Sequence, residues 1–195
     1  MAYALGCSNM ALYLSRLKGV DLRLGGSGNL GASNATLLLG WRAGVLVALH
    51  DIGKAAIAVV LAELIYPDVK NIGAVAGVAA VMGHIFPAPM RFRGGKGFAA
   101  YIGMTLALNW KFALAVMVMV LMVTIITDYI VVGTTATVLL VPGYLGWEQR
   151  NLLLAIILLL ATAVILYKHK ENYVRMKRGT EIGLRSAARG ERRVR

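Results

Sequence analysis

The apolar stretch ATLLLGWRAGVLVALHDIGKAAIAVVLAELIY (residues 35–66) decides the fold class of this chain. It is longer than the roughly 20 apolar residues that a helix needs to cross the hydrocarbon core of a bilayer. The 195-residue chain is 58% hydrophobic and 15% charged, with a mean hydropathy of +0.69. These values exclude a soluble globular domain, a disordered chain and a coiled coil, and they predict an all-α integral membrane protein. Further apolar runs lie at residues 2–14, 72–90, 98–108, 112–127, 129–147 and 152–167.

The distribution of charge predicts how the helices thread the membrane. The formal net charge is +12, from 21 Lys+Arg and 9 Asp+Glu, and the basic residues gather in residues 16–42, residues 91–96 and the tail from Lys168 onward. Loops rich in Lys and Arg stay on the cytoplasmic side of a membrane. If the apolar segment 98–127 divides at residues 109–111, this rule predicts about seven transmembrane helices, an outside N-terminus and a cytoplasmic C-terminus.

We expect a single membrane-embedded domain over residues 1–195, with residues 179–195 as a basic cytoplasmic tail. The arginines of this tail suit binding to anionic lipid, and we expect its extreme end to lie on lipid or to be disordered. Nucleic-acid binding is not predicted, because no aromatic-interleaved module accompanies the basic residues.

A glycine-rich segment, GGSGNLGASN (residues 25–34), precedes the apolar stretch. Glycines let successive backbone N–H groups converge on one point, and a following helix N-terminus adds positive charge, which is typical of a phosphate cradle. Short polar side chains lie within it, and Arg42 is expected two turns into the next helix. The alternative is a flexible Gly/Ser linker with an Asn helix cap.

A second segment, GHIFPAPMRFRGGKG (residues 83–97), ends a predicted helix at its prolines and places Lys96 among glycines before another helix. It is not a Walker A loop, since residue 97 is Gly in place of Ser or Thr, so an ATPase is not predicted. A basic loop that merely obeys the positive-inside rule is the alternative interpretation.

Ionisable residues interrupt the long apolar stretch at His50, Asp51 and Lys54. Asp51 and Lys54 are three residues apart and share a helix face, so they can form an ion pair or line a polar site. In the tail, His169, Asn172 and Arg175 fall at helical spacing on one face, which favours a site there, although a basic amphipathic helix on lipid has the same pattern.

Several catalytic motifs are missing from the sequence. It contains no HExxH, no Cys/His metal spacing, no GxSxG and no HxxxxD acyltransferase motif. We therefore expect no metal site and a nucleophile that is not a protein side chain.

Four segments taken in order resemble one family, the bacterial acyl-phosphate-dependent glycerol-3-phosphate acyltransferases (PlsY). The matching stretches are GSGNLGASN (26–34), DIGKA (51–55), GHIFPAPMRFRGGKG (83–97) and HKENYVRMKRGTE (169–181). The resemblance implies a bacterial inner-membrane enzyme with its active site toward the cytoplasm. It would move a fatty acyl group from acyl phosphate to the sn-1 hydroxyl of glycerol 3-phosphate, giving lysophosphatidic acid and phosphate in phospholipid biosynthesis. It implies a reaction without acyl-CoA, a cofactor or a metal ion. We expect membrane lipids but no nucleic acid as partners, and seven spans of modest length suit a monomer.

The resemblance also implies the site residues. Catalytic roles fall to Ser27, Asn29, Arg42, Lys96, His169 and Asn172. Substrate or phosphate binding falls to Gly26, Gly28, Gly31, Ser33, Asn34, Lys54, His84, Gly94, Gly95, Gly97 and Glu181. The chain departs from the family pattern at Ser33, Ala55 and Ala100, of which Ala100 removes a hydroxyl.

Two questions stay open at this level. We assign the first loop to acyl phosphate and the Lys96 loop with His169 and Asn172 to glycerol 3-phosphate, but the two assignments can be exchanged. The general base is either His169 or an oxygen of the substrate's own phosphate, and we favour the latter because no carboxylate near His169 is evident to orient its ring. A small membrane transporter or anion channel, and then a lipid-binding scaffold, are the rival functions.

Overall fold

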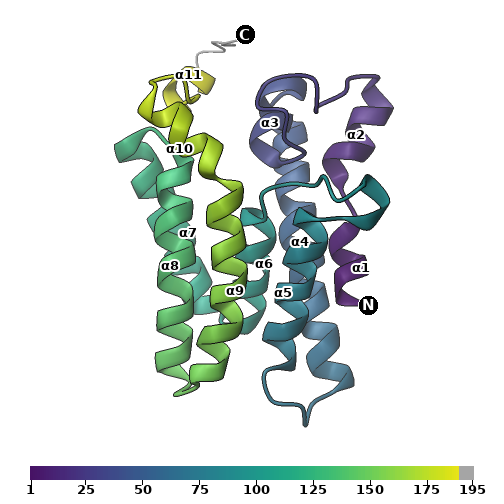
Figure 1. Cartoon of the computed structure of the whole chain (residues 1–195), viewed down its shortest axis with the longest axis vertical. Coiled ribbons are helices and arrows are strands. Elements are labelled where there is room, and N and C mark those ends of the chain that lie inside the picture. The colour runs from purple at the N-terminus through teal and green to yellow at the C-terminus, as the bar shows by residue number, and fades with distance from the viewer. Residues whose placement is uncertain (189–195) are drawn as a thin grey trace.

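The computed structural model describes residues 1–188, and every regular element in that range is helical (Figure 1). This confirms the all-α prediction. Residues 189–195, the end of the predicted basic tail, lie outside the described residues. The helices are α1 (Ala2–Cys7), α2 (Met10–Lys18), α3 (Ala32–Leu39), α4 (Trp41–Ile65), α5 (Ile72–Ile85), the 3-10 turn η1 (Ala88–Met90), α6 (Phe98–Leu108), α7 (Trp110–Thr127), α8 (Ile130–Glu148), α9 (Leu152–Lys168), α10 (Lys170–Lys177) and α11 (Leu184–Ala188).

Four segments within residues 1–188 are long and apolar enough to cross a membrane: α4, α5 together with η1, α7 and α8. A fifth candidate is α9 with α10, which meet at a 43° bend, whereas α6 is shorter. The total of about seven spans and the orientation of the termini therefore stay predictions.

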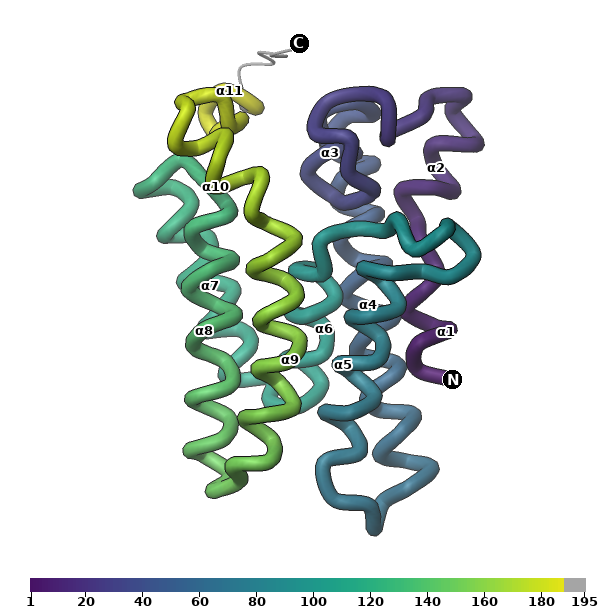
Figure 2. Tube along the Cα trace, viewed as in Figure 1, coloured from purple at the N-terminus to yellow at the C-terminus, as the bar shows by residue number. Residues whose placement is uncertain are grey.

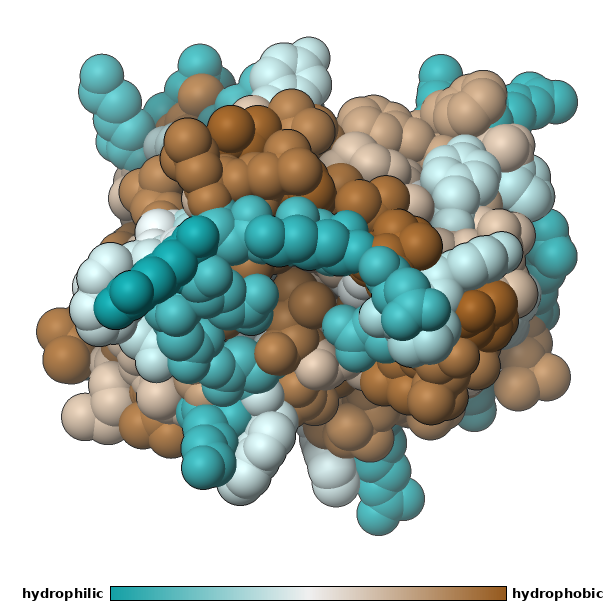
Figure 3. Space-filling model, turned by 90° about the horizontal axis from the view of Figure 1, so that it is seen from below, coloured by the Kyte–Doolittle hydropathy of each residue, from teal (hydrophilic) through white to brown (hydrophobic). Residues whose placement is uncertain are grey.

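The outer surface of the bundle is strongly apolar. Large side chains such as Leu49, Ile126 and Leu152 are 62%, 72% and 76% exposed. Seen from the end that carries the α4–α5 turn, hydrophobic side chains surround a polar band that crosses the end face (Figure 3). An apolar belt of this extent is stable only against lipid, so the chain is a membrane protein.

The first apolar run is broken at Ser8–Asn9 into α1 and α2. The Asn9 side chain caps α2, because its Oδ1 accepts from the Leu12 N–H at 2.9 Å. The break leaves the Ser8 carbonyl outside the helical ladder, where it accepts from Lys54 Nζ at 2.6 Å. Backbone irregularity at membrane depth is tolerated where protein groups satisfy it, as here.

The long apolar stretch also forms two helices. Gly40 lies between α3 and α4 with a φ of 90°, a backbone conformation that favours glycine. The sequence interpretation placed Arg42 two turns into a helix that began near Asn34. That is wrong, because the break restarts the helix and puts Arg42 in the first turn of α4.

The helices pack closely through small residues. A Cβ at Gly103 would collide with the backbone of Ile52, and one at Gly77 would collide with Met104, so α6 lies against both α4 and α5. The α5 helix also packs against α9. This packing places the segment 86–97, which follows α5, on the side of the bundle where α9 lies (Figure 2).

Candidate active site

Predicted site segments lie toward one end of the bundle (Figure 1). The glycine-rich loop leads into α3 at this end, and α10 continues α9 there. The segment 86–97 crosses the bundle on the way from α5 to α6 (Figure 2). The turns between α4 and α5 and between α8 and α9 lie at the opposite end.

The centre of the site is a chain of polar contacts around Asn172. Lys96 Nζ donates to Asn172 Oδ1, and Asn172 Nδ2 donates to Glu181 Oε1 at 2.5 Å. Arg175 Nε completes the chain by donating to Glu181 Oε2 at 2.6 Å. The structure thus brings together three of the candidate site residues, Lys96, Asn172 and Glu181.

Lys96 receives only longer-range compensation for its positive charge, because the Glu181 and Glu171 carboxylates act on it electrostatically without contacting it. Within residues 1–188 no carboxylate oxygen lies at ion-pair distance from Lys96 Nζ, since Glu181 is paired with Arg175. Burial and the positive charge of Arg175 lower the pKa of Lys96 to about 8. A partly buried cation without a carboxylate partner is a natural anion-binding group.

His169 is buried one turn before Asn172. Its Nδ1 lies 2.8 Å from the Ile165 carbonyl oxygen, so Nδ1 carries the proton and donates. Nε2 is therefore the acceptor nitrogen. The ring is oriented by the backbone of α9, in place of the carboxylate that the sequence did not reveal.

The glycines of the Lys96 loop serve close packing against the end of α5. The Gly94 and Gly95 amides donate to the carbonyls of Ile85 and His84, each at 3.1 Å. A Cβ at Gly95 would collide with the His84 ring. The expectation that these two amides point at a phosphate is therefore wrong, because both already donate inside the protein. Gly97, with a φ of 94°, is the N-cap residue that immediately precedes α6.

The first glycine-rich loop is closed by a buried asparagine. Asn34 Oδ1 accepts from the Ser27 amide at 2.8 Å, and its Nδ2 donates to the Leu22 carbonyl at 2.8 Å and to the Gly25 carbonyl at 3.2 Å. The Gly28 amide also donates within the loop, to the Gly25 carbonyl. Asn34 thus shapes the loop, and the loop is not the flexible linker of the alternative interpretation.

The remaining predicted residues of this loop stay accessible. Ser27 and Ser33 are exposed, and Asn29 is partly buried. Gly26 lies against Asn34, and Gly31 precedes α3, whose first turn has no side-chain cap. Arg42 is exposed, with its guanidinium 5.6 Å from the centre of the Trp41 ring.

Lys54 and His84 belong to a buried network between α1, α4 and α5. Lys54 Nζ lies 2.8 Å from Asp51 Oδ1 and 2.9 Å from His84 Nδ1. His84 Nδ1 also lies 3.3 Å from Asp51 Oδ1, and the other side of the His84 ring, at Nε2, faces Gly95. His50 joins through Asp51 and the Ser8 hydroxyl. Through the His84 ring, which packs against Gly95, the network supports the Lys96 loop.

Two groups that support the site, the Ser8 carbonyl and the Tyr3 hydroxyl, could not be predicted from the sequence pattern. The Ser8 carbonyl has no sequence signature as an acceptor for Lys54. The Tyr3 hydroxyl, which donates to the Phe86 carbonyl at 2.6 Å and accepts from the Ala88 amide at 3.1 Å, ties α1 to the segment after α5. By contrast, the spacing of Asn172 and Arg175 did point to a shared helix face. No cluster of three or more potential metal-ligating His, Cys, Asp or Glu side chains occurs within residues 1–188.

The fold and this site define a class: helical membrane proteins with a cationic, hydrogen-bonding site at one end of the bundle. The glycerol-3-phosphate acyltransferase family model matches residues 1–179. A glycerol-3-phosphate acyltransferase of Myxococcus xanthus is 36% identical over 182 residues, which cover 93% of this chain and 95% of the relative.

Solved structures agree. PlsY (YgiH), an integral membrane glycerol 3-phosphate acyltransferase, matches in its glycerol 3-phosphate form with a TM-score of 0.90 and 30% identity, covering 96% of this chain and 94% of that chain. Its lysophosphatidic acid form matches with a TM-score of 0.84 and 30% identity, covering 93% and 91%. The chain belongs to the PlsY family of glycerol-3-phosphate acyltransferases, which confirms the resemblance that its motifs indicated.

Proposed function

We propose that this chain is a glycerol-3-phosphate acyltransferase that uses acyl phosphate as its donor. It transfers the fatty acyl group to the sn-1 hydroxyl of glycerol 3-phosphate and releases lysophosphatidic acid and inorganic phosphate, a step in phospholipid biosynthesis. The observation that carries the proposal is Lys96, a partly buried cation that has no carboxylate at ion-pair distance within residues 1–188 and that donates to Asn172 at the polar end of a membrane-embedded bundle. Relatives that match nearly the whole chain are named glycerol-3-phosphate acyltransferase, which supports the acceptor and the type of transfer.

We assign glycerol 3-phosphate to the side of the site that holds Lys96. The ammonium group and the amide of Asn172 bind its phosphate, and His169 Nε2 accepts a hydrogen bond from its hydroxyl. Because Gly94 and Gly95 use their amides internally, side chains supply the binding on this side, while His84, Lys54 and Gly97 hold the loop in place.

We assign acyl phosphate to the first loop. The hydroxyls of Ser27 and Ser33 and the amide of Asn29 are the available hydrogen-bonding groups, and Arg42 at the start of α4 neutralises charge. The uncapped first turn of α3 offers further N–H groups. The acyl chain lies between helices, where the surface is apolar.

The reaction needs little covalent help, because an acyl phosphate is a mixed anhydride with a good leaving group. The glycerol oxygen attacks the acyl carbonyl, the bond from carbonyl carbon to phosphate oxygen breaks, and the departing phosphate takes the hydroxyl proton. Positioning of the two substrates supplies much of the rate, and donors such as Ser27 or Asn29 stabilise the oxyanion. No protein base, metal or cofactor takes part in this proposal.

We further propose that the protein works as a monomer in the bacterial inner membrane with this site toward the cytoplasm. The end that carries α3 and α10 holds Arg16, Lys18, Arg23, Lys168 and Lys170, whereas the opposite turns hold Lys70, Lys111 and Arg150. The excess of basic residues at the site end supports this orientation by the positive-inside rule.

The donor assay tests the proposal. Protein in detergent, treated with chelator, is given glycerol 3-phosphate with either palmitoyl phosphate or palmitoyl-CoA. We expect lysophosphatidic acid only from palmitoyl phosphate. Product from palmitoyl-CoA alone would keep an acyltransferase but refute the donor, and no product from either would refute the enzyme.

A further inference from the structure

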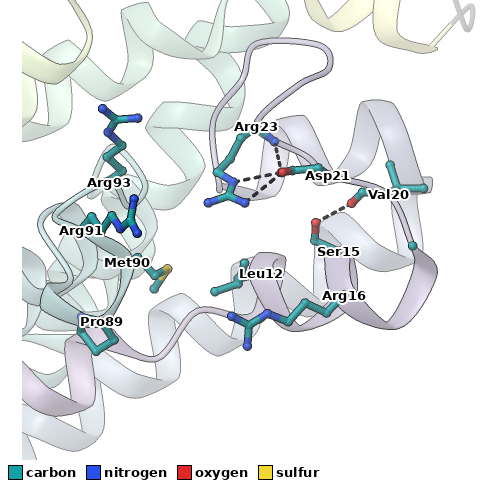
Figure 4. A pocket seen from close by; sticks show the side chains of 11 residues that line it. Leu12, Ser15, Arg16, Val20, Asp21, Arg23, Pro89, Met90, Arg91 and Arg93 are labelled. Carbon is teal, nitrogen blue, oxygen red and sulfur yellow. Dashed lines mark hydrogen bonds and ion pairs between the residues drawn. The ribbon is translucent and has the colours of Figure 1, made fainter.

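A cavity of about 480 Å³ lies beside the site, between α2 and the segment after α5 (Figure 4). Residues between Leu12 and Arg23 form one wall, and residues 89–93 form the other. None of the residues that we assign to the reaction lines it. Four arginines do: Arg16, Arg23, Arg91 and Arg93.

The charges around this cavity are unbalanced. Among the described residues, Asp21 is the only carboxylate that lines it, and Arg23 occupies both oxygens, with Nε 3.0 Å from Oδ1 and Nη2 2.9 Å from Oδ2. Within residues 1–188, Arg16, Arg91 and Arg93 have no ion-pair partner. Three guanidinium groups without an ion-pair partner therefore line one cavity, and guanidinium groups bind phosphate with paired hydrogen bonds.

The backbone that presents two of these arginines adopts an uncommon conformation. Arg91 and Phe92 have φ values of 52° and 60°, in the left-handed region that non-glycine residues rarely occupy. The Phe92 amide donates to the Pro87 carbonyl at 3.0 Å and the Arg93 amide to the Met90 carbonyl at 3.1 Å. Non-glycine residues keep the left-handed conformation only where the surrounding structure holds them in it.

The same cavity has an apolar side. Leu12, Val20 and Met90 line it together with the arginines, and Leu17 and Leu24 next to it are 79% and 87% exposed. A ligand of this cavity meets both cations and apolar side chains, because Leu12 and Met90 lie among the arginines (Figure 4).

We propose that this cavity binds the phosphate group of an anionic phospholipid. Arg16, Arg91 and Arg93 hold the phosphate, and the glycerol and upper tails lie along Leu12 and Met90. Residues 91–93 lead directly into the Lys96 loop, so an occupied cavity ties that loop to α2. Free inorganic phosphate shares the recognised group and is distinguished from lipid by the test.

The test compares two triple variants with the same loss of positive charge. Arg16→Gln/Arg91→Gln/Arg93→Gln removes the cavity cations, and Lys18→Gln/Lys70→Gln/Lys177→Gln removes exposed lysines that do not line the cavity. Binding of dioleoylphosphatidylglycerol is measured by native mass spectrometry in detergent, with dioleoylphosphatidylcholine as the zwitterionic comparison. A parallel thermal-shift titration uses sodium phosphate against sodium chloride at equal ionic strength.

We expect wild type and the lysine variant to retain one phosphatidylglycerol preferentially, and the arginine variant to bind it at least about tenfold more weakly. A thermal shift with sodium phosphate that depends on the arginines, without lipid retention, would support the cavity with free phosphate as its ligand. Equal lipid binding by all proteins, or an equal loss in both variants, would overturn the proposal. The single variants Arg91→Gln and Arg93→Gln repeat the test if the triple variant does not fold.

Discussion

Replacing Asp51 by asparagine is expected to destabilise the whole bundle. Asp51 is 1% exposed and Lys54 is 6% exposed, and their charged atoms lie 2.8 Å apart between α1, α4 and α5. Without the carboxylate, Lys54 retains the Ser8 carbonyl as a neutral acceptor, but its buried charge is no longer compensated.

The size of the effect follows from burial. Removing one partner of a buried ion pair costs about 3–5 kcal/mol, because the other charge is left in a medium of low polarity. A chain of this length loses about 2–4 °C of melting temperature per kcal/mol, so we expect Asp51→Asn to melt about 6–20 °C below wild type.

The assay is thermal unfolding in detergent, followed by tryptophan fluorescence. Asp21→Asn is the matched control, since it also removes a carboxylate paired with a cation, but its pair with Arg23 is on the surface. We expect this control to melt close to wild type. The double variant Asp51→Asn/Lys54→Met removes both charges and should recover much of the loss. An Asp51→Asn protein as stable as wild type, or a double variant no better than the single, would refute the reasoning.

Four further predictions concern the site. Lys96→Met should raise the KM for glycerol 3-phosphate by about tenfold or more, the worth of a hydrogen bond to a charged group, while Lys18→Gln leaves it unchanged in steady-state kinetics. Because the pKa of Lys96 is lowered to about 8, its charge is present below pH 8 and lost above it, so affinity for glycerol 3-phosphate should fall from pH 8 to 10. In Lys96→Arg, whose guanidinium stays protonated, that decline should vanish, and an unchanged pH profile would exclude Lys96 as its source. His169→Ala should keep measurable turnover with weakened affinity, whereas complete loss of turnover with intact affinity would assign the base to His169. Asn34→Ala, which removes three hydrogen bonds from the first loop, should make residues 25–31 more sensitive to proteolysis, and unchanged cleavage kinetics would contradict its role in shaping the loop.

Local spacing predicted part of the site correctly. Asp51 and Lys54 lie three residues apart on one helix, and the structure pairs them. The division of residues 98–127 at residues 109–111 was left open by hydropathy and favoured by the charge distribution; the structure divides the segment there, and the Asn109 side chain caps α7 by accepting from the Phe112 amide at 3.0 Å. Both features depend on neighbours along one helix, which sequence spacing reports directly.

Long-range features were not predictable in this way. The contact of Lys54 with Ser8 joins residues 46 apart and depends on how α1 packs on α4. The glycines at 94 and 95 looked like an anion cradle, but their amides are used by the end of α5. Glycine permits both arrangements, so only the packing distinguishes them.

The tail shows the same limit. The lipid-bound or disordered state was predicted only for its extreme end, which lies outside the described residues. The sequence did not predict α11, which lies against the α7–α8 turn. There the Leu184 amide donates to the Asp128 carbonyl and the Arg185 amide to Asp128 Oδ1, each at 2.8 Å. These bonds use backbone amides, which every sequence has, so composition gave no sign of them.

The central claim, acyl transfer from acyl phosphate to glycerol 3-phosphate, is tested most directly by following the phosphorus atoms of both substrates in one tube. Phosphorus-31 NMR of purified protein with palmitoyl phosphate, glycerol 3-phosphate and chelator distinguishes the two substrates from the two products. We predict that inorganic phosphate and 1-acyl lysophosphatidic acid rise together in equal amounts, and that Lys96→Met slows both. Phosphate that appears without lysophosphatidic acid would show simple hydrolysis and would contradict the account.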